Sequence, residues 1–145
     1  MKKHILIALT CLASITTLAQ TTQIKVEFNS FVPVTVSQKN GEMVFGNEIE
    51  VKASAKITDS LVIVTDHLGK DTKYRVLRNY TGLDPINNSS AGLFTISLFV
   101  IDDSTNKFWN IDLFKLDASP TSIGFSIHDM ERTLRYNGNL LTWSN

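Results

Sequence analysis

Cysteine is almost absent from this sequence, because its 145 residues include a single one, Cys11. A lone cysteine forms no disulfide within the chain and excludes sites built from several thiolates. Secreted domains shorter than ~80 residues usually need disulfides because their cores are small. A chain of this length can instead bury enough apolar surface to fold as one domain without them.

An excess of positive charge is also missing, since 14 Lys and Arg residues balance 14 Asp and Glu residues and form no cluster. Basic patches attract nucleic acids and anionic lipids, so we expect neither as a partner. His67 and His128 stand in no spacing that would place two imidazoles on one metal ion. The seven glycines form no phosphate-binding loop. We therefore expect no metal and no cofactor.

An apolar run covers residues 5–19, directly after a positively charged start. It is shorter than the ~20 apolar residues that cross a bilayer and contains several hydroxyl side chains, so we expect no stable membrane insertion. A positive start, an apolar centre and small residues before position 20 are typical of an export signal. We predict a signal peptide over residues 1–19, cleaved between Ala19 and Gln20, and a single periplasmic or extracellular domain over residues 20–145.

Cys11 raises an alternative prediction for the location of the protein. Bacterial lipoproteins resemble this layout, since they carry a lipid-modified cysteine at the end of the apolar segment. Cys11 departs from that pattern because it follows Thr10 and precedes more signal-like sequence, Leu12 to Ala19. A lipoprotein anchored at Cys11 is therefore the alternative to a cleaved signal, and cleavage after Ala19 would leave a chain without cysteine.

Apolar and polar residues alternate along several stretches, which is typical of strands with one buried face. The clearest stretch runs from Ile49 to Ile57, and others cover residues 24–28, 94–100, 109–113 and 123–127. No helical period is sustained after residue 20. The sequence therefore predicts an all-β domain.

Two Asn-Gly pairs separate alternating stretches, at Asn40-Gly41 and Asn137-Gly138. Asn-Gly is the strongest short signal for a hairpin turn, because both residues tolerate positive φ. The resulting registers place Val36 opposite Phe45, Leu134 opposite Leu141, and Arg132 opposite Trp143. Further polar loops are expected at residues 66–71, 102–107 and 117–122, with a longer one at 81–92.

About nine or ten strands joined mostly by short turns predict an antiparallel meander. Such a meander forms a small barrel-like or sandwich domain, and the short connections favour the barrel. We expect the terminal strands, Gln23 to Phe28 and Asn139 to Ser144, to lie at sheet edges. An edge strand can pair with a strand of another protein.

Three large aromatic residues, Trp109, Tyr136 and Trp143, fall on positions predicted to face the core. In a barrel of about eight strands, such side chains fill the interior or line a cavity for one small ligand. They are therefore the candidate binding residues. The lipocalin barrel is an analogy for this shape alone, because the G-x-W motif of that family is absent from the first strand.

The segment from Ile127 to Arg132 holds the densest group of titratable side chains, with His128, Asp129 and Glu131 at its centre. A polar cluster between two alternating stretches is typical of a charged hairpin loop. A hydrolase would instead need these side chains within hydrogen-bond reach of one another.

Three functions remain open. The first is a non-enzymatic secreted domain that binds a small apolar molecule or another exported protein, and this is the reading we favour. The second is a structural or interaction protein that acts by edge-strand pairing. The third is a hydrolase that uses the segment from Ile127 to Arg132.

Overall fold

The computed structural model describes residues 22–37, 40–81, 95–116, 121–130 and 132–144. Over these residues the chain forms nine strands and no helix, which confirms the all-β prediction. None of the described stretches could therefore cross a membrane as a helix. The strands are β1 (Gln23–Val36), β2 (Met43–Phe45), β3 (Ile49–Thr58), β4 (Leu61–Thr65), β5 (Asp71–Asn79), β6 (Thr95–Asp102), β7 (Phe108–Lys115), β8 (Ser122–His128) and β9 (Thr133–Ser144).

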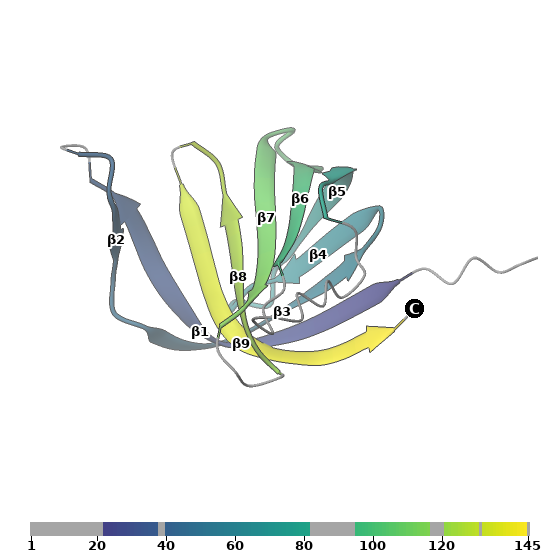
Figure 1. Ribbon diagram of the computed structural model, residues 1–145, viewed down its shortest axis with the longest axis horizontal. Coiled ribbons are helices and arrows are strands. Elements are labelled where there is room, and N and C mark those ends of the chain that lie inside the picture. The colour runs from purple at the N-terminus through teal and green to yellow at the C-terminus, as the bar shows by residue number, and fades with distance from the viewer. Residues whose placement is uncertain (1–21, 38–39, 82–94, 117–120, 131, 145) are drawn as a thin grey trace, which may run out of the picture.

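The strands form an antiparallel meander that closes into an eight-stranded barrel with one additional strand, so the preference for a barrel is confirmed. From β3 to β9, each strand pairs with the next one in the chain, and β3 also pairs with β1. Closure comes from β1, which pairs with β9 from Gln23 opposite Ser144 to Val34 opposite Thr133. Figure 1 shows these two long strands side by side, with the end of β9 beside the start of β1.

The barrel interior is packed with side chains from alternate positions of the strands. Leu113, Ile123 and Phe125 are completely buried. The Phe28 ring stacks on Phe125 at 5.0 Å and on Tyr136 at 5.2 Å between ring centroids. The alternation read from the sequence therefore identified the buried face of most strands, although Phe94 lies outside the described residues.

The prediction that the terminal strands lie at sheet edges is wrong for Gln23 to Phe28. The first half of β1 pairs with β3 on one side and with β9 on the other. β9 pairs with β1 along its length but with β8 only from Thr133 to Asn139, so the register with β8 ends where the second predicted segment, Asn139 to Ser144, begins. Closing a barrel pairs the first strand with the last, so the first half of β1 is not an edge.

The prediction of a hairpin at Asn137-Gly138 is also wrong, because both residues lie within β9. Leu134 pairs with Ile127 and Pro33, and not with Leu141. Arg132 and Trp143 likewise do not face each other across a turn. The glycine serves a close approach between strands, because a Cβ on Gly138 would lie 2.0 Å from the carbonyl oxygen of Glu27.

The hairpin at Asn40-Gly41 exists, but its register differs from the prediction by two residues. Val36 pairs with Met43, and Phe45 pairs with Val34. The amide of Gly41 donates to the carbonyl of Ser37 at 2.8 Å, which gives a longer turn than type I′. Only Gly41 of the Asn-Gly pair has positive φ, at 71°. A shift of two residues keeps every side chain on its predicted face.

The predicted polar loops at residues 66–71 and 102–107 are confirmed as the β4–β5 and β6–β7 connections. In the second loop, the Asp102 carboxylate accepts hydrogen bonds from the amide and hydroxyl of Ser104, both at 2.7 Å, and from the Thr105 amide at 3.3 Å. Residues 1–21, most of the long loop at 81–92 and most of the stretch 117–122 lie outside the described residues, so the predicted cleavage after Ala19 and the Cys11 alternative stay predictions.

Candidate functional site

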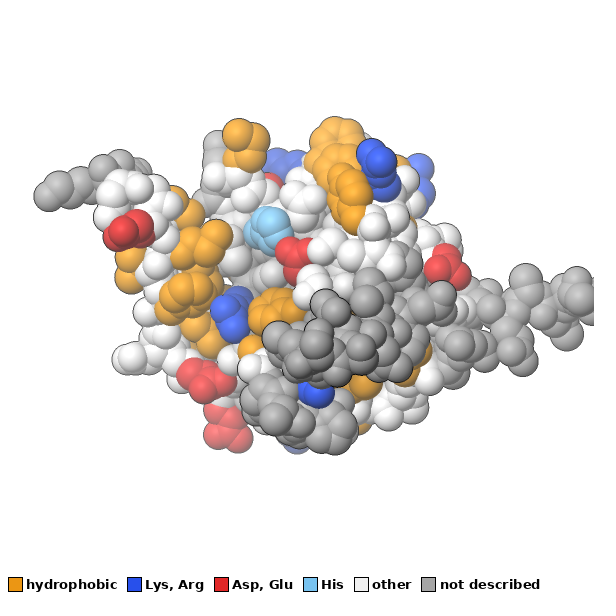
Figure 2. Space-filling view, viewed as in Figure 1, with side chains coloured by type: hydrophobic (Ala, Val, Ile, Leu, Met, Phe, Trp, Pro, Cys, Tyr) orange, Lys and Arg blue, Asp and Glu red, His pale blue; other side chains and the backbone are white. Residues whose placement is uncertain are grey.

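The main exposed apolar surface lies on a hairpin that extends beyond the barrel. We call this the β1–β2 arm and define it as residues 33–37 and 40–46. Val36, Met43, Val44 and Phe45 are between 41% and 57% exposed, and Ile49 at the start of β3 is 50% exposed. Figure 1 shows β2 standing apart from the barrel wall, and Figure 2 shows hydrophobic side chains gathered over it.

The outer edge of β2 presents backbone groups to the surroundings. Ser37 donates to the Glu42 carbonyl at 2.8 Å and Gly46 donates to the Pro33 carbonyl at 2.7 Å, so positions 42, 44 and 46 bond to β1. Because bonding direction alternates along a strand, the amides and carbonyls of Met43 and Phe45 face away from β1. Among the described strands, only β1 pairs with β2.

The base of the β1–β2 arm is fixed to the barrel by Glu48. Its carboxylate accepts hydrogen bonds from the hydroxyl of Ser30 and from the side-chain amide of Asn137, the latter at 3.2 Å. The bond from Ser30 and then that from Asn137 lower the pKa of Glu48 below its ordinary value. Glu48 thus connects the segment after β2 with β1 and β9.

A second contact holds the middle of the arm. The Arg135 guanidinium lies 5.5 Å from the ring centroid of Phe45 and 5.2 Å from that of Phe114. These distances fit cation–π contacts. Phe114 in turn covers Gly124, where a Cβ would lie 2.5 Å from the ring. Arg135 therefore connects Phe45 of the arm with Phe114 on the outer wall of the barrel.

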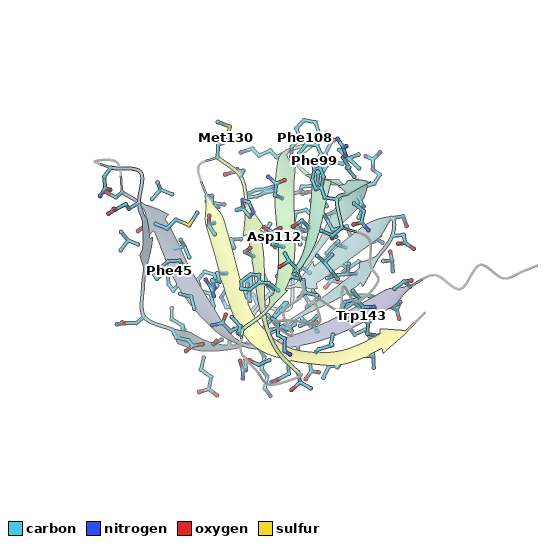
Figure 3. All side chains as sticks on the ribbon, in the orientation of Figure 1. Phe45, Phe99, Phe108, Asp112, Met130 and Trp143 are labelled. Carbon is cyan, nitrogen blue, oxygen red and sulfur yellow. The ribbon has the colours of Figure 1, made fainter. Side chains whose placement is uncertain are left out.

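The outer wall also carries a row of polar side chains from three strands. The Ser97 hydroxyl donates to Oδ1 of Asp112 at 2.5 Å, and Nε2 of His128 lies 2.7 Å from Oδ2 of the same carboxylate. Figure 3 shows Asp112 near the middle of β7. A hydrolase triad needs the imidazole between the hydroxyl and the carboxylate. Here the carboxylate lies between the other two groups, so His128 makes no bond that would activate Ser97.

The segment predicted as a hydrolase alternative begins with the last two residues of β8, and its described residues 129, 130 and 132 follow before β9. The Asp129 carboxylate accepts a hydrogen bond from the Arg132 amide at 2.7 Å, while His128 is bound to Asp112. Glu131 lies outside the described residues. The two described members of the trio are therefore bound to different groups.

The three candidate binding aromatics lie in or against the core. Trp109 and Tyr136 are buried, and Trp143 packs against the buried cluster from the end of β9. Burial raises the pKa of Tyr136, with a smaller contribution from Asp66. These aromatics do not line any of four pockets formed by the described residues. Their role in binding stays a prediction.

The largest of those four pockets is an outer groove of about 800 Å³ near the β6–β7 and β8–β9 turns. Phe99 and Phe108 stack there at 5.5 Å between centroids, beside Asn110 and the fully exposed Met130. Figure 3 shows Phe99, Phe108 and Met130 at this end of the barrel. Sequence reasoning missed this groove, although a phenylalanine at the outward position 99 was a signal.

The described residues contain no cluster of three or more side chains suited to a metal ion. The fold and the exposed surfaces define an eight-stranded antiparallel barrel with a packed interior and a projecting apolar arm. Comparison with protein-family models, with curated proteins and with solved structures found no significant match to this chain.

Proposed function

We propose that the protein is a non-enzymatic interaction module that binds another protein through the β1–β2 arm. The observation that carries this proposal is the combination of exposed apolar side chains and outward-facing backbone groups on β2. Apolar side chains gain free energy when they leave water, and an outward edge offers hydrogen bonds to an added strand. The contacts of Glu48 and Arg135 support the proposal, because a fixed arm loses little conformational entropy on binding.

A site-specific cross-link tests this function. A photoreactive amino acid would replace Val44 in the producing cell, and a control would carry it at Leu68, which is exposed in the β4–β5 turn. We expect one protein adduct of defined mass at position 44 and none at position 68. Equal, weak adducts at both positions would contradict the proposal.

Binding of a small apolar molecule is the second candidate, and the outer groove favours it. The stacked rings of Phe99 and Phe108 offer an apolar surface beside polar groups of Asn110 and His128, a mixture common in ligand sites. The fluorescence of anilinonaphthalene sulfonate would report binding. Phe108→Ser should weaken it several-fold, whereas Leu77→Ser, an exposed control on β5, should not.

We further propose that the chain is exported and cleaved between Ala19 and Gln20, so that the barrel acts in the periplasm or outside the cell. The order of charged, apolar and small residues over positions 1–19 supports this. The intact mass of the protein from its producing cell should correspond to residues 20–145. A lipid-modified chain beginning at Cys11 would overturn it.

A further inference from the structure

We propose that β2 pairs with the β2 strand of a second copy of this chain, so that two barrels form a symmetric dimer. This inference rests on the proposed function, because it names the occupant of the β1–β2 arm. The backbone direction, the side chains and the charges of β2 each fit a copy of the same strand.

The backbone of β2 is self-complementary around Val44. The outward groups belong to Met43 and Phe45, which lie one residue on either side of Val44. If two copies run antiparallel with Val44 opposite Val44, Met43 of each copy faces Phe45 of the other. Each of these facing pairs exchanges both amide-to-carbonyl bonds, as hydrogen-bonded pairs of an antiparallel ladder do. All outward groups of β2 are then satisfied.

The side chains fit the same register. Met43 of one copy would lie beside Phe45 of the other, a sulfur–aromatic contact of the kind found in protein cores. Val34 and Val36 continue that apolar face on each β1, because they pair with Phe45 and Met43. Val44 would meet Val44 on the opposite face, and pairs of β-branched residues stabilise antiparallel strands. Pairing of the two copies would therefore cover apolar side chains of β2 on both faces of the joined sheet.

The charges next to β2 also permit this register and limit its length. Glu42 would face Gly46 of the second copy, so no carboxylate faces another carboxylate. Pairing stops after Phe45 because the strand ends there and Glu48 binds Ser30 and Asn137. A symmetric contact uses the same edge in both copies, so it closes as a dimer and does not propagate into a fibre.

Disulfide trapping tests the register directly. Val44→Cys would be introduced into the chain that also carries Cys11→Ala, and Met43→Cys would serve as the matched control. Directly opposite residues have Cβ atoms about 4.5–5.5 Å apart, whereas diagonal neighbours lie about 7–8 Å apart. A disulfide needs about 3.5–4.5 Å. We expect Val44→Cys to form a covalent dimer at least tenfold faster than Met43→Cys under mild oxidation.

A proline variant tests the backbone bonds. Met43→Pro removes an amide that faces away from β1, so it leaves the β1–β2 bonds in place. Met43→Ala removes the same side chain but keeps the amide. In sedimentation equilibrium, Met43→Pro should weaken dimerisation at least tenfold more than Met43→Ala does. Equal dissociation constants for the two variants would contradict a strand-paired dimer.

The outcomes separate this inference from the proposed function. A chain that is monomeric at 100 µM, or that traps equally slowly at positions 43 and 44, would overturn the dimer. If the photo-cross-link at Val44 then still captured a different protein, the β1–β2 arm would remain an interaction surface. A monomer without any adduct at position 44 would overturn both.

Discussion

Gly138 shows how strongly a single residue constrains the closure of this barrel. A Cβ at this position would lie 2.0 Å from the Glu27 carbonyl oxygen and 2.6 Å from the Cα of Phe28. Both contacts are with backbone, which cannot move aside as the end of a flexible side chain can. The absence of a side chain therefore allows β1 and β9 to approach each other.

We expect Gly138→Ala to destabilise the protein by about 3 kcal/mol or more, because the strands must separate. Gly69→Ala is the control, since Gly69 has a positive φ of 77° but an added Cβ would meet no atom within 4 Å. Backbone strain alone should cost about 1–2 kcal/mol there. Urea unfolding monitored by tryptophan fluorescence gives both values, and equal losses would contradict the close-approach explanation.

Asp102 stabilises the β6–β7 turn from a nearly buried position. Burial by itself would raise its pKa, but the hydrogen bonds from Ser104 and Thr105 outweigh that effect and lower it. We expect Asp102→Ala to cost about 1–3 kcal/mol in urea unfolding. Asp103→Ala removes only an exposed ion pair with Arg75 and should cost less than about 1 kcal/mol. A larger loss of stability for Asp103→Ala than for Asp102→Ala would contradict this role of Asp102.

The same carboxylate contributes to the acid limb of stability. Its pKa is lower in the folded state than the ordinary value of 3.8. Its stabilisation is therefore fully present above pH 3.8 and is lost as the pH falls through the folded pKa. The difference in stability between the wild type and Asp102→Asn should accordingly shrink below pH 3.8.

Tyr74 should affect the stability of the protein at alkaline pH. Burial, followed by the charges of Asp102 and Tyr136, raises the pKa of Tyr74 from 10.0 to about 12. The folded state then holds its proton more tightly than the unfolded state, so stability falls as the pH rises from 10 to 12. The Tyr74→Phe variant should lose less stability over that range in urea unfolding. An identical slope for both proteins would contradict the burial of Tyr74.

At the scale of the element, the β1–β2 arm depends on its contacts at the base. We expect Glu48→Ala to speed amide exchange at Ser37 and Gly46, because the segment after β2 loses its bonds to Ser30 and Asn137. Glu50→Ala, on the exposed face of β3, should leave both rates unchanged. Hydrogen exchange measured by NMR distinguishes the two, and unchanged rates in Glu48→Ala would contradict its anchoring role.

The strands were predictable where burial alone decides the pattern. Leu113, Phe125 and Ile57 alternate with polar residues because one face of each strand lies in the core. The register of β1 with β9 was not predictable, because it joins residues from opposite ends of the chain. Asn137-Gly138 resembles a turn locally, and only the position of Glu27 shows why the glycine is there.

The candidate site was predicted less well than the fold. β2 has only three residues, too few to show an alternating pattern, and the Asn40-Gly41 turn was placed two residues away from its true register. The start of β1 was predicted as an edge but is paired on both sides, whereas the edge strand β2 was not predicted. The stacked pair of Phe99 and Phe108 occupies the outward face, where alternation predicts polar residues. The alternation of apolar and polar residues predicts which side chains are buried, but it does not predict which exposed side chains form a binding surface.

At the scale of the whole molecule, closure and packing leave the β1–β2 arm as the place where the sheet extends beyond the barrel. Pairing of β1 with β9 closes the barrel, and packed side chains fill the interior. The described strands hold this fold by apolar burial and strand pairing. The apolar edge of β2 is the feature on which the proposed pairing with a partner strand rests.

Amide hydrogen exchange at β2 tests this central claim most directly, measured by NMR at 10 µM and at 1 mM protein. We predict that the Val44 amide, which faces β1, is protected at both concentrations. The amides of Met43 and Phe45 should exchange rapidly at the low concentration and become protected at the high one. Rapid exchange at Met43 and Phe45 at both concentrations would contradict strand pairing between copies, and an unprotected Val44 would contradict the β1–β2 arm itself.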